Sequence, residues 1–380
     1  MGHTRAAAAI GDELESAGIA SDVVDAYDYA ASIFATVVAD GYLNLVARFP
    51  NVYRLIYERA ERARGAGAGR RWISRFAAQN LRSLVEARRP SAVVCTHAFP
   101  CGVMAAYKQY VDPDLPVFGV ITDFVVHPYW IYDRIDDYTV ATPEMRDTLL
   151  ERGIASDRVH VDGIPVDARF TARVDRTAVR RRLGLPVDQP LILVMGGGLG
   201  MGAIDMMIDA LASVRTPITV VALLGTNARC AARIRARAQS LPFEVRIVEY
   251  VENVYDYMRA SDVLLTKPGG LSTSEALAAE LPMVLARPLP GQEERNAQYL
   301  VSRGAALAAD EPLRIAELVE LILRDAQLRD MLLEQMRRVA RPAAAASLAG
   351  RIATQVGHAP GCERRAWNLP VRRTERWPSG

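Results

Sequence analysis

Residues 263–277 read VLLTKPGGLSTSEAL, and this stretch decides the fold that we expect. It opens on a short apolar run, which is typical of a strand buried on both faces of a parallel sheet. Two glycines then form a turn, and a helical pattern follows. Helix N-termini at such turns bind anions through free backbone amides and the positive end of the helix dipole. The stretch therefore predicts a strand–turn–helix unit with an anion site at its turn.

The same rhythm of apolar runs and helical segments extends along the chain. We expect strands in residues 91–96, 116–121, 138–141 and 159–161, and again in 191–195, 218–224, 245–248, 263–266 and 283–286. Two successive series of this kind predict an α/β protein with two doubly wound, Rossmann-like sheets. The expected divisions are an N-terminal domain in residues 1–165, a C-terminal domain in 166–340, a terminal helix in 341–356 and a basic tail in 357–380.

Composition excludes several classes of protein. With 380 residues, 50% of them apolar and 24% charged, the chain is globular in character and long enough for two domains. No apolar run approaches the roughly 18 residues that span a bilayer, and the first residues begin no secretory leader. The 4 cysteines are too few for a disulfide framework or a zinc cluster. We therefore expect a cytoplasmic protein without a structural metal.

Positive charge is concentrated in two places. Residues 48–89 contain eleven arginines and three glutamates, and residues 357–380 contain five arginines and two glutamates. Such clusters indicate an anionic partner. No nucleic-acid-binding motif is present, so we expect an anionic membrane surface instead. Arginine beside tryptophan and aliphatic residues is typical of an interfacial segment, which predicts membrane contact by Arg70, Arg71, Trp72 and Arg75. The alternative is a core helix with a solvated basic face.

Two further loops share the chemistry of residues 263–277. GGGLG at 196–200 follows an apolar strand and could bind a phosphate, or could simply be a tight turn. PGQEERNA at 290–297 places the amide of Gln292 beside the carboxylate of Glu293, a pair that suits vicinal sugar hydroxyls, although any polar helix start would look the same. In the first stretch, Ser272 and Thr273 are expected to cap the helix and donate to phosphate. Glu275 could accept ribose hydroxyls or close a capping box.

Together these motifs resemble one family. Its signature in this chain comprises LSTSE at 271–275, PGQEERNA at 290–297, EYV at 249–251, GHTRAA at 2–7, THAFP at 96–100, TDF at 122–124 with His127 and Trp130, and GIPV at 163–166. Over about residues 2–340 the chain is similar to monogalactosyldiacylglycerol synthases and processive diacylglycerol glucosyltransferases. These are GT-B glycosyltransferases related to the lipid II-forming N-acetylglucosaminyltransferase.

The resemblance implies an inverting transfer of a hexose from a UDP-sugar to a diacylglycerol-like lipid, at a cleft between the domains and with no metal or other cofactor. It implies a peripheral protein on the inner face of the cell membrane. The diphosphate would be held by residues 196–200, including Gly197, Gly198 and Gly200, and by Ser272 and Thr273, with Lys267 as a cation near the leaving group. Glu275 would bind the ribose, Tyr250 and Val251 the uracil, and Gln292 and Glu293 the sugar, while Gly270 and Leu271 complete the donor-binding set. Alternatives are a glycosyltransferase acting on a soluble natural product and a UDP-sugar- or membrane-binding protein that has lost turnover.

An inverting displacement needs a general base on the acceptor hydroxyl. The family implies His3 for this role, with Asp123 and His127 as alternatives or as residues that orient His3. Loop packing is the competing interpretation of His127 and of His97. Family members carry an apolar strand and a glycine-rich turn before the Gly-His pair, so we expect the chain as given to lack its first strand. Because His3 is then the third residue with no strand before it, we also expect its side chain to be poorly fixed.

Overall fold

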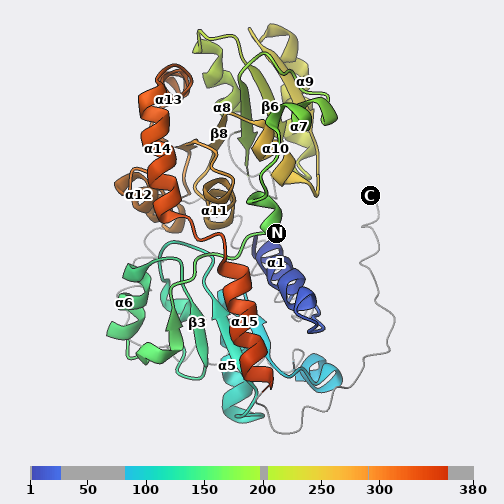
Figure 1. The fold of residues 1–380 in the computed structure, drawn as a ribbon, viewed down its shortest axis with the longest axis vertical. Coiled ribbons are helices and arrows are strands. Elements are labelled where there is room, and N and C mark those ends of the chain that lie inside the picture. The colour runs from blue at the N-terminus through green and yellow to red at the C-terminus, as the bar shows by residue number, and fades with distance from the viewer. Residues whose placement is uncertain (1, 27–81, 197–203, 290, 358–380) are drawn as a thin grey trace.

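A computed structural model of the chain describes residues 2–26, 82–196, 204–289 and 291–357. Within them the chain forms two parallel sheets, with the six-stranded sheet above the four-stranded one in Figure 1. The first sheet has the order β1-β2-β3-β4, with strands Val93–Cys95, Val117–Val120, Asp137–Thr139 and Val159–His160. Its helices are α1 (Gly2–Ser16), α5 (Ala98–Tyr110) and α6 (Pro143–Glu151). We call this part the N-terminal domain.

The second sheet has the order β10-β9-β8-β5-β6-β7 and defines the C-terminal domain. Its strands are β5 (Leu191–Met195), β6 (Thr219–Leu223), β7 (Glu244–Val248), β8 (Val263–Thr266), β9 (Met283–Ala286) and β10 (Leu307–Ala309). Its helices are α7 (Arg176–Arg182), α8 (Ile204–Ala210), α9 (Ala228–Arg237), α10 (Val254–Ala260), α11 (Gly270–Ala278), α12 (Gln292–Ser302), α13 (Pro312–Arg324) and α14 (Ala326–Val339). The two parallel sheets confirm the predicted fold class.

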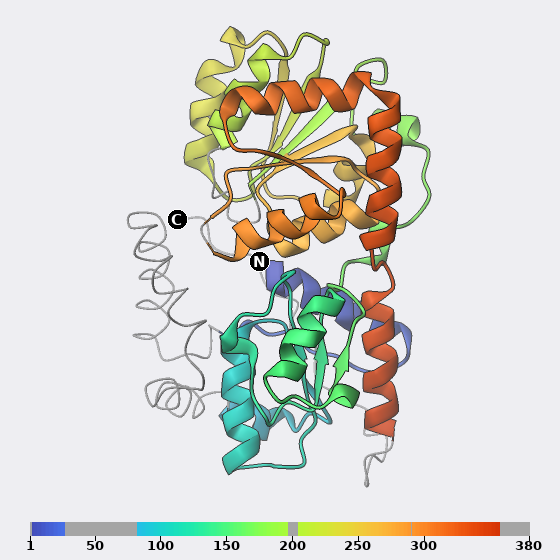
Figure 2. The same ribbon diagram turned by 90° about the vertical axis from the view of Figure 1, so that its left-hand side faces the viewer.

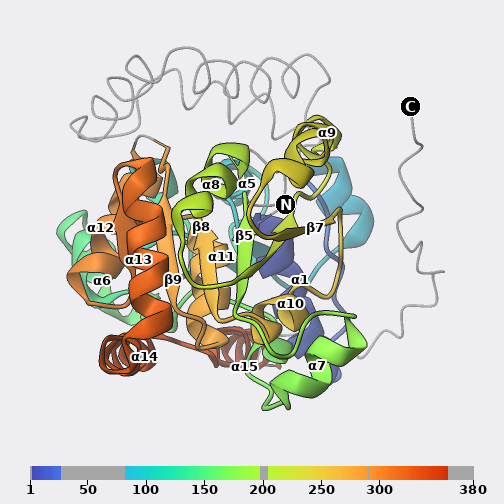
Figure 3. The same ribbon diagram turned by 90° about the horizontal axis from the view of Figure 1, so that it is seen from above.

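Strand β5 shows why the predicted strands are continuous apolar runs. All five of its side chains are buried. Ile192 and Val194 pack into one core with α8 and α13, whereas Leu191 and Leu193 pack into another with α10 and α11. Because helices cover both faces of the sheet (Figure 3), alternate side chains must all be apolar.

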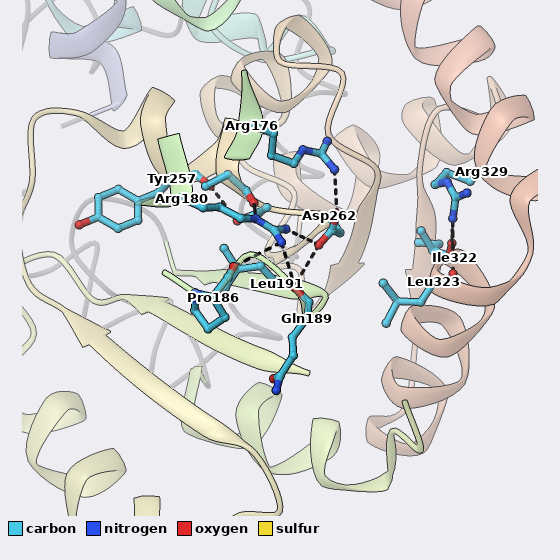
Figure 4. Close-up of polar contacts among 12 residues, drawn as sticks. Arg176, Arg180, Pro186, Gln189, Leu191, Tyr257, Asp262, Ile322, Leu323 and Arg329 are labelled. Atoms are coloured by element: carbon cyan, nitrogen blue, oxygen red, sulfur yellow. Dashed lines mark hydrogen bonds and ion pairs between the residues drawn. The ribbon is translucent and has the colours of Figure 1, made fainter. Parts of the chain in front are cut away.

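A buried arginine organises the edge of this sheet where β5 and β8 begin (Figure 4). Arg180 of α7 is 6% exposed, and it donates to the carbonyls of Ala260 at 2.7 Å and Gln189 at 2.9 Å. It also pairs with Asp262 at 2.6 Å, and the same Asp262 oxygen accepts from the Leu191 amide at 2.7 Å. A buried charge is tolerated because it is paired and hydrogen-bonded.

The last helix of the described residues, α15 (Ala344–Gly357), follows the C-terminal domain and packs on the N-terminal one. Figure 2 shows α14 beside the upper sheet and α15 continuing beside the lower sheet. Leu348 and Ile352 of α15 meet Ile10 of α1 and Phe118 of β2 in one apolar cluster. Arg351 fixes the helix through Asp137 at 2.9 Å and the Thr139 hydroxyl at 2.8 Å, and it also pairs with Asp162.

In the part of the chain that the structure describes, two segments thus cross between the domains, and the two crossings touch. Gly163 lies in the first crossing with φ of 104°, a backbone conformation that favours glycine. A Cβ at this position would lie 2.3 Å from Cβ of Arg341, which belongs to the second crossing. Glycine is therefore required here both by the backbone conformation and by close packing.

Several sequence-based predictions lie outside the described residues. These are the basic segment with Arg70, Arg71, Trp72 and Arg75, the loop residues Gly197, Gly198 and Gly200, and the tail from residue 358. The first described element is α1, which begins at Gly2, and the expected lack of a preceding strand stays a prediction. None of the helices in the described part of the chain is long and apolar enough to cross a membrane.

Candidate active site

The ends of β5 and β8 lie side by side where the strand order of the larger sheet reverses. Strand β5 pairs with β6 on one side and with β8 on the other, so the chain after β5 and the chain after β8 leave from neighbouring strands. Ligands of open α/β sheets bind at the carboxyl ends of the strands at such a point. The Thr266 hydroxyl at the end of β8 donates to the Met195 carbonyl at the end of β5 over 3.0 Å, which holds the two ends together.

Helix α11 begins earlier than the sequence suggested. Gly269 is its N-cap and makes no side-chain cap, so Ser272 and Thr273 already lie within the first turn. The Thr273 hydroxyl is fully buried and donates to the Gly269 carbonyl at 2.9 Å. Capping by Ser272 and Thr273 was therefore a wrong prediction, because the extended Gly269 takes that position. Glu275 lies beyond the third helical position, so the capping-box interpretation of Glu275 is also wrong.

Glu275 is instead an almost fully buried carboxylate. It is 2% exposed, Oε1 lies 3.4 Å from the Arg5 guanidinium of α1, and Oε2 has no hydrogen-bond partner among the described residues. Burial raises the pKa of Glu275 to about 7, while Arg5 opposes the rise and Asp167 adds to it. A buried carboxylate oxygen without a partner is costly unless a ligand satisfies it. Arg5, supplied by the other domain, was missed by sequence reasoning.

Helix α12 presents the second set of predicted donor residues. It starts after Gly291, which has φ of 90° and whose amide donates to the Glu294 carboxylate at 3.0 Å. Glu293 accepts from Lys267 at 2.7 Å and from the Leu289 amide at 2.8 Å. Lys267 and Glu293 therefore neutralise each other between the end of β8 and the start of α12.

Asp123 connects the domains at this point. It follows β2, and its two oxygens accept from Gln292 Nε2 at 3.0 Å and from Asn296 Nδ2 at 2.9 Å. Asn296 is fully buried; it also donates to the Pro268 carbonyl at 3.1 Å and accepts from the Phe124 amide at 2.9 Å. Burial raises the pKa of Asp123 to about 6, although the hydrogen bond from Asn296 opposes the rise. The structure therefore brings Asp123 to the predicted sugar-binding residues, and no direct contact with His3 is found among the described residues.

The backbones of the two domains also touch. A Cβ on Gly270 would lie 2.0 Å from the Thr122 carbonyl oxygen and 3.0 Å from the Asp123 Cα. Only glycine permits this approach, so Gly270 serves domain packing as well as the turn that the sequence predicted.

His3 is held firmly, contrary to our expectation for a third residue. Its Nδ1 lies 2.9 Å from the Thr96 carbonyl and 2.8 Å from the Thr122 hydroxyl, and its ring packs edge-on against His97 with centroids 4.5 Å apart. Because a carbonyl only accepts, Nδ1 carries the proton and Nε2 keeps a lone pair. Burial lowers the pKa of His3 to about 4, so the ring is neutral at physiological pH.

His97 and His127, the two other histidines considered in the sequence, make local contacts. His97 caps α5 by accepting from the Phe99 amide at 3.1 Å. His127 is buried and accepts from the Tyr129 amide at 3.3 Å, at the start of the short 3-10 helix Pro128–Trp130. These contacts match the loop-packing interpretation of both residues.

The remaining predicted donor residues lie along the same sheet edge. Tyr250 and Val251 follow β7; Tyr250 is 64% exposed and Val251 is half-buried. Leu271 is buried against α1, where Gly2 approaches its Cβ, and Ser272 is half-buried.

Comparison with known sequences identifies two families along the chain. Residues 3–166 match the family described as Monogalactosyldiacylglycerol (MGDG) synthase, and residues 175–339 match Glycosyl transferases group 1. Over 343 residues the chain is 26% identical to the processive diacylglycerol beta-glucosyltransferase of Bacillus cereus strain AH187, covering 90% of this chain and 87% of the relative.

Solved structures show the same architecture. MurG of Acinetobacter baumannii superposes with a TM-score of 0.60 at 16% identity, covering 93% of this chain and 96% of MurG. Anabaena Alr3699/HepE in complex with UDP superposes with a TM-score of 0.54 at 14% identity, covering 73% of this chain and 82% of that one. These likenesses confirm the GT-B fold, and the family matches together with the Bacillus cereus relative confirm the resemblance found in the sequence.

Proposed function

We propose that this chain, a GT-B protein whose halves match the monogalactosyldiacylglycerol synthase and group 1 glycosyl transferase families, transfers a hexose from a UDP-sugar to a diacylglycerol-like lipid. The name of the Bacillus cereus relative supports the lipid acceptor, and the UDP complex of HepE supports the nucleotide. One observation carries the proposal most directly. The buried Glu275, with a carboxylate oxygen that lacks a partner among the described residues, lies at the switch point of the larger sheet, where nucleotides bind in such folds.

The donor would lie along the carboxyl edge of the larger sheet. Glu275 would accept the two ribose hydroxyls, and the backbone of Tyr250 and Val251 would contact uracil. Amides at the start of α11 and the half-buried Ser272 hydroxyl would hold the diphosphate. The same amides would stabilise the charge that develops on UDP as it departs, so the proposed mechanism uses no metal.

His3 would act as the general base from the N-terminal domain. Its neutral ring, with Nδ1 protonated toward the Thr96 carbonyl, leaves Nε2 to take the proton of the attacking hydroxyl. An anionic diphosphate bound near the ring would raise the pKa of His3 toward neutrality, because a nearby negative charge favours imidazolium. Attack from the face opposite UDP would invert the configuration at the sugar carbon.

The lipid acceptor requires contact with a membrane surface. We propose that Arg70, Arg71, Trp72 and Arg75 provide it and that the protein is peripheral on the inner face of the cell membrane. Each cation near an anionic surface contributes about 1 kcal/mol. Binding of the whole chain to vesicles containing acidic lipid should therefore weaken steeply with added salt. Vesicle binding that does not change with either salt concentration or acidic lipid content would contradict this part of the proposal.

The test is a transfer assay with the whole chain. Each labelled UDP-hexose is offered with diacylglycerol in mixed vesicles, or with soluble alcohols and phenols, in the presence and absence of a chelator. We expect label in the lipid extract, β-anomeric product by proton NMR, and turnover that persists with the chelator. Label only in soluble products would favour a soluble acceptor, and nucleotide binding without turnover would favour a binding protein. The matched Glu275→Gln variant should lose nucleotide affinity in every assay.

A further inference from the structure

One carboxylate of the N-terminal domain bridges two amides on one helix of the C-terminal domain. Asp123 accepts from Gln292 and from Asn296, which lie one turn apart on α12. The bridge joins residues 169 and 173 positions apart in sequence, and it lies beside the Gly270–Thr122 backbone contact. It therefore forms only when the two domains are docked as the structure shows.

The chemistry of Asp123 decides which way the Gln292 amide faces. An ionised carboxylate accepts hydrogen bonds and donates none. Although burial raises the pKa of Asp123 to about 6, the group is still mostly ionised at neutral pH. Gln292 must therefore turn Nε2 toward Asp123, and its Oε1 has no hydrogen-bond partner in the described part of the chain. The residue is half-buried, so this carbonyl oxygen remains available as an acceptor.

The side-chain amide of Asn296 cannot turn over in response to a change in the hydrogen-bonding groups of Asp123. Its Oδ1 accepts from the Phe124 amide and its Nδ2 donates to the Pro268 carbonyl, two backbone groups whose roles are fixed. Because Asn296 is fully buried, turning its amide over would leave both backbone groups without partners, which disfavours the turned amide strongly. Any change at Asp123 is therefore transmitted to Gln292.

We propose that Asp123 is a positioning residue that fixes the Gln292 amide so that its carbonyl oxygen meets a hydroxyl of the donor sugar. Sugar recognition then depends on docking of the N-terminal domain, although Gln292 itself belongs to the C-terminal one. The inference rests on the proposed function and adds the polarity of the sugar contact to it. It also assigns Asp123 a role other than general base.

Substitutions can exchange the acceptor that residue 292 offers the sugar for a donor, and can then restore the acceptor. In Asp123→Asn the introduced amide must turn its oxygen to Asn296, so its nitrogen faces Gln292. Gln292 then turns over and offers the sugar an N–H donor in place of an acceptor. When Gln292→Glu is added to the same chain, the introduced carboxylate accepts from that amide nitrogen and again presents an oxygen to the sugar. Gln292→Glu alone places two carboxylates together and disrupts the bridge.

The experiment measures donor KM, kcat and UDP affinity for the whole chain as wild type, Asp123→Asn, Gln292→Glu and the double variant. Each single variant should lose about 10–100-fold in kcat/KM for the UDP-sugar, the value of a misoriented charged hydrogen bond. The double variant should recover to within about fivefold of wild type. UDP affinity, measured by calorimetry, should change by less than about threefold throughout and reports that each variant is folded.

Three results would overturn the inference. The first is a double variant whose loss of kcat/KM equals the product of the two single losses. The second is an Asp123→Asn variant as active as wild type. The third is inactivity of both chains that carry the Asp123→Asn substitution, which would point to Asp123 as the base. Failure of the proposed function looks different, because then the wild type itself neither transfers sugar from UDP-sugar nor binds UDP.

Discussion

Replacing Gly270 by alanine tests whether the contact between the domains is required for transfer. The added Cβ would lie 2.0 Å from the Thr122 carbonyl oxygen, whereas Cβ atoms essentially never approach closer than 3.0 Å. Both partners are backbone, so no side chain can move aside. The loop that carries Asp123 and the start of α11 must separate by about 1 Å or more.

That separation has a cost that the structure allows us to work out. Three hydrogen bonds cross the interface here: Gln292 to Asp123 at 3.0 Å, Asn296 to Asp123 at 2.9 Å, and Phe124 to Asn296 at 2.9 Å. Lengthening each donor–acceptor distance by about 1 Å breaks all three hydrogen bonds. Two involve a charged group at about 1.5–3 kcal/mol each, and the third contributes about 1 kcal/mol, so docking loses about 4–7 kcal/mol.

The neighbouring glycine provides a matched control. A Cβ on Gly269 would meet nothing within 4 Å, and its φ of −73° suits any residue. We expect Gly270→Ala to lower kcat by at least about 100-fold while UDP affinity stays within about threefold, because His3 can no longer approach the donor. Gly269→Ala should resemble wild type in both respects. The reasoning is refuted if the two variants transfer sugar equally well, or if UDP affinity falls in parallel with turnover.

Three further predictions follow from individual side chains. Glu275→Ala should weaken UDP binding by about 1–3 kcal/mol, whereas Gln292→Ala should leave UDP binding nearly intact and impair only the sugar-dependent step; equal losses of UDP affinity would contradict both roles. Since the pKa of Glu275 is raised to about 7, its ionised form prevails only above that pH, so UDP affinity should fall as pH is lowered through 7 and this dependence should flatten in Glu275→Gln. Arg351→Met should lower the free energy of unfolding by about 2–3 kcal/mol in denaturant titrations. The control Arg314→Met removes an exposed pair with Glu317 and should lower it by less than about 1 kcal/mol. Equal effects would show that α15 is not held by Arg351.

The fold was predictable because the signal for a doubly wound sheet is local. A strand such as β5, covered by helices on both faces, must be apolar throughout, and glycines mark the turn that follows β8. The same local reasoning located Glu275, Gln292 and Glu293 at the carboxyl edge of one sheet.

The partners of those residues were not predictable, because they come from the other domain. Nothing in the pattern around Asp123 indicates that it reaches α12, and nothing near Arg5 indicates that it approaches Glu275. Such contacts depend on how two separately folded sheets dock. Helix starts were also misplaced where backbone conformation decided them, as at Gly269, whose extended backbone begins α11 before the hydroxyl residues that sequence preference favours.

The return of α15 to the N-terminal domain has a consequence for synthesis of the protein. The apolar cluster of Ile10, Phe118 and Leu348 joins residues from the beginning and the end of the chain. Among the described residues, α1 and α15 together cover the face of the N-terminal sheet that carries Phe118, so this cluster is complete only once α15 has been synthesised. The C-terminal domain, whose sheet and helices α7 to α14 are contiguous, can complete its core earlier. Within the described residues, the sheet that is made first thus completes its packing last, and a nascent chain stalled before residue 344 would lack the α15 side of this apolar cluster.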